Sequence, residues 1–329
     1  MIKPQPSDFF VSCSEVIFFL YSLNIDVCCL TSIDQYFSYE HDKNKFTIIT
    51  CPSFISLFIA ANITSRDTSL SLYQFVCHHI VGSEETVKTK RTFNTIRDTL
   101  SVSEYYIPII SGSFGEGLEM MGSDLDIMFV ISNVRVYEDI NTVQFNSTET
   151  SFVIDMDNCK LGFTHLRLVQ SNHAYILEWC EQIGDYIYLS SELLKTSVMS
   201  APEQQSNLLH HVHGPCMSDI SGNFDIAICF HSRQWISPAH KWVTRPNTSW
   251  PSSELKSKII DHGILFVPIG CKGSKNEDIE WRFSFSVGEK LLIYSFTHVQ
   301  LICYALMKIL LKDVIETDDD CQGLLVHII

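Results

Sequence analysis

The sequence predicts a mixed α/β (α+β) fold, because helix-like and strand-like patterns occupy different stretches of one chain. Apolar residues recur at spacings of three and four over residues 68–100, which is typical of an amphipathic helix. Short apolar runs with strand-like alternation follow, separated by turn residues. After Trp250–Pro251 the pattern becomes helical again. With 329 residues, 46% of them hydrophobic, the chain can form one large domain or two around a substantial core.

The first helix is expected to use Asp67, Thr68 or Ser69 as its N-cap and to relax at Gly82. Its second half carries the basic residues Lys88, Lys90, Arg91 and Arg97. Two interpretations of this basic face stay open. It is either an ordinary solvated helix face or a surface that contacts nucleic acid or nucleotide.

The remaining elements follow from local pattern and turn chemistry. Strands are expected at residues 105–110, 125–131, 151–155, 164–169, 222–230 and 264–268, and helices at 252–262, 286–293 and 297–315. Residues 151–155 and 164–169 are expected to form a hairpin around Asn158–Gly162.

Composition limits the classes of function. The chain has 38 acidic and 23 basic residues, a net charge of −15, which argues against nucleic-acid binding over its whole surface. Twelve cysteines without a Cys-x-x-Cys pair favour reduced thiols and a cytoplasmic protein. The apolar stretch 9–31 is interrupted by Glu15 and Asp26, so it is interpreted as a buried or non-native segment rather than a membrane anchor.

Residues 111–130, SGSFGEGLEMMGSDLDIMFV, are the most informative segment. Four of the fourteen glycines fall between Gly112 and Gly122, where the backbone needs unusual dihedrals or a close approach to a ligand. A loop with backbone N–H groups and the Ser113 hydroxyl is a plausible cradle for phosphate.

Asp124 and Asp126 flank Leu125 in the strand that follows this loop. Alternate residues of a strand share a face, so the two carboxylates are expected to point the same way, about 7 Å apart. Leu125, Ile127 and Phe129 are expected to face a core. Neighbouring carboxylates repel unless a cation lies between them, and oxygen ligands suit Mg²⁺ or Mn²⁺. These residues predict metal-assisted phosphoryl or nucleotidyl transfer.

Asp225, in the strand-like GNFDIAICF, is the candidate third carboxylate, because a two-metal site needs acids from neighbouring strands. Asp155 and Asp157 repeat the Asp-x-Asp spacing but lie beside turn residues, so they are interpreted as turn formers. Arg282, flanked by aromatic residues, could clamp phosphate or stack on a base.

Six segments in this order resemble the nucleotidyltransferase family of cyclic GMP–AMP synthase (cGAS) and the Mab-twenty-one-like (male abnormal) proteins. They are GS at 112–113, DLD at 124–126, FDIAICF around Asp225, SWPSS at 249–253, EWRFSFSVGEKLL at 280–292 and ALMKILL at 305–311. The match covers roughly residues 69–315 and is most similar to the invertebrate branch, which includes cGAS-like receptors.

The resemblance implies a polymerase-β-like nucleotidyltransferase core with a mixed sheet and a C-terminal helical lobe. On this basis residues 1–66 are an unmatched segment, 67–250 the core with its long spine helix, and 251–329 a partial helical lobe. It implies that Asp124, Asp126 and Asp225 hold two Mg²⁺ or Mn²⁺ ions. Gly112 and Ser113 would contact the triphosphate. The positions that would contact base, ribose or phosphate are Arg282, Ser284 and Lys308.

The implied activity is Mg²⁺-dependent transfer between ATP and GTP, as in a cyclic-dinucleotide synthase of innate immunity activated by double-stranded RNA or another nucleic acid. The zinc insertion of cGAS has no counterpart in IYSFTHVQ, so no zinc is expected. The histidines of HHVHGPC at 210–216 are interpreted, with Cys216, as an incidental cluster. Family members continue beyond this chain's last matched helix, so an incomplete or alternatively spliced form is expected.

Two alternatives stay open. The chain could be a non-catalytic scaffold or binding protein of the same fold, as developmental members of the family are. It could also be a hydrolase or carry an unrelated metal site, but the Gly-Ser loop would then be unexplained.

Overall fold

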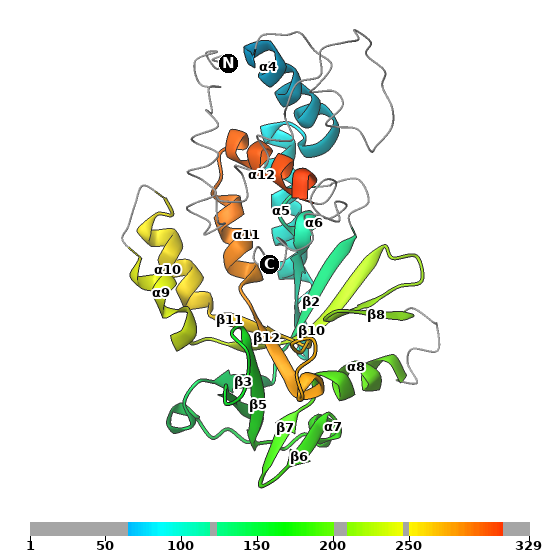
Figure 1. The fold of residues 1–329 in the computed structure, drawn as a ribbon, viewed down its shortest axis with the longest axis vertical. Helices are drawn as coiled ribbons and strands as arrows, with labels where there is room; N and C mark the ends of the chain where they lie inside the picture. Colours follow the sequence, from blue (N-terminus) through cyan, green and yellow to red (C-terminus); the bar gives the residue numbers. More distant parts are fainter. Residues whose placement is uncertain (1–64, 119–123, 201–208, 246–249, 312–329) are drawn as a thin grey trace. The chain divides into compact units, whose positions relative to one another are not determined.

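The structure, a computed structural model, describes residues 65–118, 124–200, 209–245 and 250–311 (Figure 1). The apolar stretch 9–31 and the end of the helix expected over 297–315 lie outside the described residues. The chain forms two compact units, one of residues 85–295 and one that combines residues up to 84 with those from 296 onward. The domain boundaries expected at residues 66 and 250 stay predictions.

The smaller unit contains three described helical elements: α4 (Ser65–Val76), the π-helical turn η3 (Cys77–Val81) and α12 (His298–Leu310). Thr297 caps α12 through a reciprocal capping box with Gln300. His298 connects α12 to the end of η3, because its Nε2 lies 2.9 Å from the Gly82 carbonyl oxygen.

The helix expected over 68–100 is interrupted where the sequence placed its weak point. Gly82 has a φ of 91°, which ends the first helical stretch. A new helix, α5 (Glu84–Leu100), follows. The expected N-cap is wrong, because Asp67, Thr68 and Ser69 already lie within α4.

The larger unit is mixed α/β. Its strands are β1 (Tyr106–Ser111), β2 (Leu125–Ile131), β3 (Val134–Tyr137), β4 (Thr150–Asp155), β5 (Phe163–Gln170), β6 (Cys180–Ile183), β7 (Tyr186–Leu189), β8 (His211–His213), β9 (Cys216–Ser218), β10 (Phe224–Ser232), β11 (Ile264–Val267) and β12 (Glu280–Ser284). Besides α5, its helices are α6 (Gly112–Gly115), α7 (Ala174–Glu178), α8 (Ser191–Ser200), α9 (His240–Thr244), α10 (Ser253–His262) and α11 (Ser286–Tyr294), with 3₁₀ turns η4 (Ile140–Thr142), η6 (Ser237–Ala239) and η7 (Glu277–Ile279).

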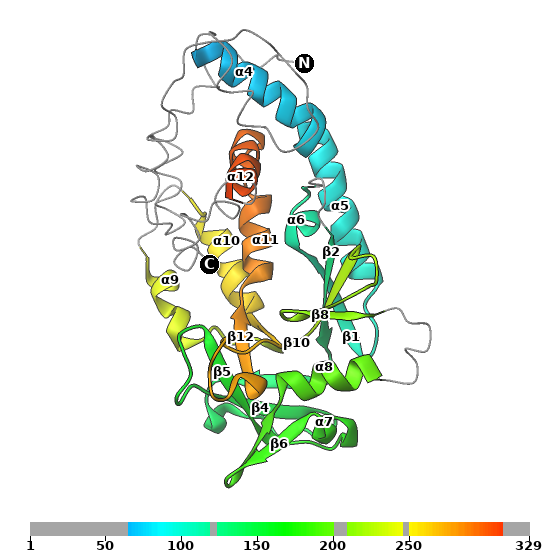
Figure 2. The same ribbon diagram turned by 45° about the vertical axis from the view of Figure 1, so that its right-hand side comes forward.

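The strands form one mixed sheet, in which eight of them follow one another in the order β1-β2-β10-β11-β12-β5-β4-β3 (Figures 1 and 2). The hairpin β6–β7 pairs with β5 through β7. β2 and β10 run parallel, whereas both β1 and β11 run antiparallel to their neighbours. The hairpin β8–β9 adds to the first half of β10 through β9. The expected hairpin of β4 and β5 is confirmed, with positive φ at Asn158 and Gly162 in its turn.

The core lies against both faces of β10, with Phe230 in one buried cluster and Ala227 and Cys229 in the other. Its largest buried side chains include Trp281, Phe152, Phe230 and Phe266, each 0% exposed. The Trp281 indole N–H also donates to the Leu189 carbonyl oxygen at 2.9 Å, so this polar atom is satisfied inside the core.

One expectation about the face of β2 is wrong. Leu125, Ile127 and Phe129 are only partly buried, whereas Met128 and Val130, on the face of Asp126, are 6% and 4% exposed. The start of α11 explains this, because its Ser286 hydroxyl lies 3.1 Å from the Met128 sulfur and covers that face. The carboxylate face of β2 therefore leads directly into a buried apolar cluster.

Candidate metal and nucleotide site

Asp126 and Asp225 lie directly opposite each other on neighbouring parallel strands. β2 and β10 pair in the register Asp126↔Asp225, so both side chains project from the same face of the sheet. Asp225 is 9% exposed and Asp126 is partly buried. Among the described residues, the Asp225 carboxylate has no hydrogen bond or ion pair. The structure thus brings together two of the three carboxylates that the sequence singled out.

Asp124, the remaining predicted carboxylate, immediately precedes β2. Its negative charge lies close enough to contribute to the raised pKa of Cys216. Burial raises the pKa of the Cys216 thiol to about 12, and the negative charges of Asp225, Asp126 and Asp124 act in the same direction.

Cys216 lies beside the two carboxylates, although the sequence analysis interprets it as part of an incidental cluster with the histidines at 210–213. Its sulfur and the carboxylate oxygens of Asp126 and Asp225 all lie within 4.8 Å of one another. The neighbouring histidines of HHVHGPC belong to neither of the metal-ligand clusters found among the described residues. The residue comes close through the return of the chain from β9 to β10, which local sequence pattern does not reveal.

Gly112 fits against Asp126 because it has no side chain. Its φ is 62°, and a Cβ at this position would overlap Asp126 Oδ2. The predicted need for glycine in the Gly-Ser loop is therefore explained by a close approach to a candidate ligand. Ser113 follows in the same short helical turn, α6.

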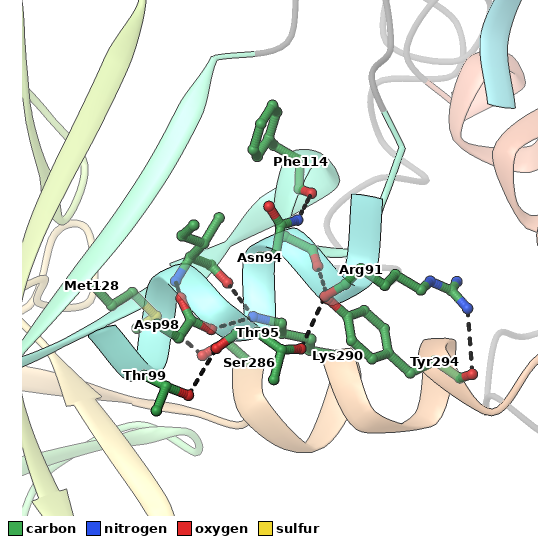
Figure 3. Close-up of polar contacts among 12 residues, drawn as sticks. Arg91, Asn94, Thr95, Asp98, Thr99, Phe114, Met128, Ser286, Lys290 and Tyr294 are labelled. Atoms are coloured by element: carbon green, nitrogen blue, oxygen red, sulfur yellow. Dashed lines mark hydrogen bonds and ion pairs between the residues drawn. The ribbon is translucent and has the colours of Figure 1, made fainter. Parts of the chain in front are cut away.

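Side chains of α5 and α11 fix this loop from behind (Figure 3). Asn94 donates to the Phe114 carbonyl oxygen at 2.7 Å, and the Tyr294 hydroxyl donates to the Gly115 carbonyl oxygen at 2.8 Å. Arg91 donates to the Glu116 carbonyl oxygen at 3.0 Å and stacks over the Tyr294 ring. The loop is therefore held by groups outside it.

A charged pair anchors the strand that leads into the loop. Lys290 Nζ lies 2.7 Å from Asp98 Oδ2, and their side chains are 11% and 22% exposed. Both residues also bond the backbone of Ile110, the lysine to its oxygen at 2.9 Å and the aspartate to its nitrogen at 2.9 Å (Figure 3). The end of β1 is thereby fixed at Ile110, two residues before Gly112.

The remaining predicted nucleotide contacts are less closely grouped. Arg282 is exposed on β12, and its positive charge acts on Cys216. Ser284 ends β12, and its hydroxyl accepts from the Ser286 backbone N–H at 3.4 Å. Lys308 lies on α12 of the smaller unit, so its contact with nucleotide stays a prediction.

Arg91 does not belong to the basic face expected on α5. The Arg91 guanidinium donates to the Glu116, Ile293 and Tyr294 carbonyl oxygens, so it is an internal structural group. Lys88 and Arg97 are exposed on the same helix.

A second group of metal-ligating residues was missed from sequence. Donor atoms of Cys159, His165 and Glu280 lie within 4.8 Å of one another. Glu280 already accepts hydrogen bonds from the Cys271 backbone N–H and the Ser274 hydroxyl, which pins the 271–274 loop. The Cys159 sulfur lies 3.5 and 3.6 Å from the two nitrogens of His165, so neither nitrogen is directed at it in preference to the other. This cluster is accounted for by packing and loop anchoring.

The interpretation of Asp155 and Asp157 as turn residues agrees with the contacts. Asp155 Oδ1 accepts from the Asp157 backbone N–H at 3.1 Å, and Asp155 Oδ2 accepts from the Tyr188 hydroxyl at 2.9 Å.

Comparison with known proteins gives no further assignment: neither a scan against protein-family models nor a search of curated proteins yields a match. Within the described part of the chain, no helix is long and apolar enough to cross a membrane.

Proposed function

We propose that this chain is a Mg²⁺-dependent nucleotidyltransferase that uses nucleoside triphosphates. The observation that carries the proposal is the register of Asp126 and Asp225 on neighbouring parallel strands, with Asp124 one residue before the first strand. On this proposal the mixed sheet is a polymerase-β-like core, and the chain is a member of the cGAS and Mab-twenty-one-like family that its motifs resemble.

The residues present fit a divalent cation. Asp225 is a nearly buried carboxylate beside a second carboxylate, and the described residues give it no cationic partner. Such an arrangement is costly unless a positive charge is present. The three carboxylates offer hard oxygen donors, which suit Mg²⁺ or Mn²⁺. When bound, Mg²⁺ would neutralise phosphate charge and lower the pKa of an attacking hydroxyl.

The chain's own residues would position the reactants. Asp225, the most buried of the three carboxylates, would accept the proton of the attacking ribose hydroxyl. The Gly-Ser loop would bind the triphosphate through backbone N–H groups and the Ser113 hydroxyl. Its anchoring by Asn94 and Tyr294 supports this role, because a preorganised loop loses little entropy when it binds.

The finer assignment also rests on the resemblance. We propose ATP and GTP as substrates, a cyclic dinucleotide as product and a nucleic acid as activator. Lys88 and Arg97 would contribute to the activator surface, and Arg91 would not. Arg282 would bind base or phosphate from its exposed position on β12.

Nucleotide-dependent thermal stabilisation tests the site. ATP or GTP with Mg²⁺ should raise the melting temperature of the wild-type chain, and the shift should vanish in the double variant Asp124→Asn/Asp126→Asn. The matched control is Asp155→Asn/Asp157→Asn, which makes the same charge change in the other Asp-x-Asp. An undiminished shift in the first double variant would exclude the metal assignment.

Turnover tests the reaction. The wild-type chain is incubated with labelled ATP and GTP, Mg²⁺ or Mn²⁺, and double-stranded RNA or DNA. New nucleotide species and pyrophosphate are expected. A chain that binds nucleotide through the carboxylates but releases no pyrophosphate under any of these conditions would instead be a binding or scaffold protein of the same fold.

A further inference from the structure

Three adjacent strands place Asp126, Asp225 and Cys216 on one face of the sheet. Asp225 pairs with Asp126 on one side and with Ser218 on the other. Since β9 and β10 are antiparallel, continuing this register by two residues sets Cys216 opposite Ala227, which shares the face of Asp225. The thiol is therefore diagonal to the Asp225 carboxylate and directed to the same side.

The small side chain of Ala227 leaves room for this approach. Ala227 is 3% exposed and belongs to the apolar cluster against which Cys216 packs. The sulfur thus lies at the inner border of the carboxylate pair, where the polar face meets the core. Cys216 and Asp126 are both partly exposed, so solvent reaches the cluster.

The separations suit one shared ion. Zinc–sulfur bonds are about 2.3 Å and zinc–oxygen bonds about 2.0–2.2 Å, so two such ligands lie at most about 4.4 Å apart and closer in a tetrahedral site. The three donor atoms already lie within 4.8 Å of one another. Side-chain rotations that move the donor atoms by about 1 Å would complete the coordination without a change in the strands.

We propose that Cys216 is a sulfur ligand that lets this site bind one thiophilic divalent cation, such as Zn²⁺ or Cd²⁺, in place of Mg²⁺. Carboxylate oxygens suit Mg²⁺ and Mn²⁺, whereas a thiolate favours softer ions. The inference rests on the proposed role of Asp126 and Asp225 as metal ligands, and it makes the site one at which soft and hard ions compete.

Binding replaces the S–H bond of Cys216 with a sulfur–metal bond and releases the proton to the buffer. The two carboxylates supply oxygen ligands, and water completes the coordination. A soft ion held this way would occupy the position that Mg²⁺ needs, so it would inhibit the proposed reaction rather than support it.

The test is a titration of the full chain with Cd²⁺ alone, followed by the ultraviolet charge-transfer band of thiolate–Cd²⁺ bonds. The chain has twelve cysteines, so the measurement is the difference between variants. Cys216→Ser and, separately, Asp225→Asn should each remove one high-affinity equivalent of bound Cd²⁺. The control Cys271→Ser, a partly buried cysteine outside the cluster, should retain that equivalent.

Two results would overturn the inference: a Cys216→Ser variant that keeps the full band, or an Asp225→Asn variant that keeps it. The second would show that Cys216 binds the metal without the carboxylates. Circular dichroism of each variant separates loss of the site from loss of the fold.

The proposed function is tested separately, by the nucleotide-dependent thermal shift of the wild-type chain and the same variants. Cys271→Ser should keep the Mg²⁺-dependent thermal shift with ATP or GTP, because Cys271 lies outside the cluster of Asp126, Cys216 and Asp225. If the wild-type chain shows the Cd²⁺ equivalent but no nucleotide shift, the proposed function fails and the sulfur-containing metal site stands. If the wild-type chain shows the nucleotide shift but lacks the high-affinity Cd²⁺ equivalent, the sulfur-containing metal site fails and the proposed function stands.

Discussion

The pair Asp98–Lys290 and the pair Asp126–Asp225 both join neighbouring elements of the larger unit, but their charges are arranged in opposite ways. The first pair is neutral overall, with a 2.7 Å contact and a backbone hydrogen bond from each partner to Ile110. The second pair is two carboxylates in register, and Asp225 forms no ion pair with any described residue. The first arrangement joins opposite charges, whereas the second brings two like charges together and leaves Asp225 without an ion pair among the described residues.

The two pairs show how structural and functional charges differ in this fold. A buried ion pair with all its hydrogen bonds made holds elements in place, and removing one partner leaves an isolated charge. Two like charges held together by strand register oppose folding slightly and favour a cation. We call Asp98–Lys290 the balanced pair and Asp126–Asp225 the unbalanced pair. Mutation of the balanced pair should therefore lower the stability of the protein. Mutation of the unbalanced pair should raise its stability and abolish its function.

The largest expected effect breaks the balanced pair. Lys290→Met should lower the free energy of unfolding by about 4 kcal/mol, because it leaves Asp98 without its cation. Urea denaturation measures this change. Lys258→Met is the control, because its ion pair with Glu254 is mostly exposed and its loss should cost less than about 1 kcal/mol. Equal losses in the two variants would show that the Asp98–Lys290 pair has no special structural role.

Gly112 lies where the Gly-Ser loop passes closest to Asp126. Gly112→Ala should lower stability by about 2 to 3 kcal/mol, because the new Cβ strains a positive φ and collides with Asp126 Oδ2. It should also abolish the Mg²⁺-dependent nucleotide shift.

Gly184→Ala is the matched control. Its φ of 61° is nearly the same, but nothing lies within 4 Å of the added Cβ, so only backbone strain of about 1 kcal/mol is expected. If both variants lose the same stability and both keep the nucleotide shift, Gly112 does not shape the carboxylate site.

A third group of buried ionisable residues, around His231, is held mainly in its neutral form. Burial lowers the pKa of His231 to about 4, the hydrogen bond to the His262 carbonyl oxygen opposes this, and the charges of His262, Arg135 and Arg233 lower the pKa further. The folded pKa is below the unfolded value of about 6.5, so the unfolded state binds the proton first as pH falls. Stability is then fully present above about pH 6.5 and is lost as pH falls toward 4.

Between pH 7 and pH 5 this histidine should contribute a loss of about 2 kcal/mol in the free energy of unfolding. Urea denaturation at both pH values measures the loss. His231→Gln, which keeps a donor for the His262 carbonyl oxygen, should lose correspondingly less over the same interval. A variant with the wild-type pH dependence would show that the effect arises elsewhere.

The sequence predicts the strands of the site well, but it predicts only in part how these strands pair in space. The bounds of β2 are as predicted, because a run of alternating apolar residues after an Asp-rich turn specifies a strand locally. Asp225 was singled out for the same reason, as a lone carboxylate in an apolar strand. Its register against Asp126 depends on how distant strands assemble, which a local pattern does not encode.

Cys216 and the Asp98–Lys290 pair show where sequence reasoning ends. Cys216 belongs to a three-residue strand beside three histidines, so its local context suggested a histidine cluster rather than the carboxylates. Asp98 and Lys290 are 192 residues apart in the chain, and no spacing rule connects them. The Gly-Pro turn between β8 and β9 was the available signal, because it predicts a hairpin that returns Cys216 toward β10.

The smallest expected effect is the most direct test of the unbalanced pair. Asp225→Asn should raise the free energy of unfolding of the metal-free chain by about 1 kcal/mol, because it removes repulsion between two carboxylates. It should also remove the Mg²⁺-dependent nucleotide shift. Urea denaturation in the presence of a chelator measures the first change.

Asp219→Asn provides the contrast, because Asp219 is equally buried and lies six residues away on the same turn-strand segment. Its Oδ1 accepts backbone N–H groups of Asn223 and Phe224 at 2.6 and 3.1 Å, so loss of its charge should destabilise the chain. Opposite signs for two buried Asp→Asn changes would locate the uncompensated charge at Asp225. A loss of stability in Asp225→Asn would instead mean that this carboxylate has a counter-charge, and the case for a cation between β2 and β10 would fail.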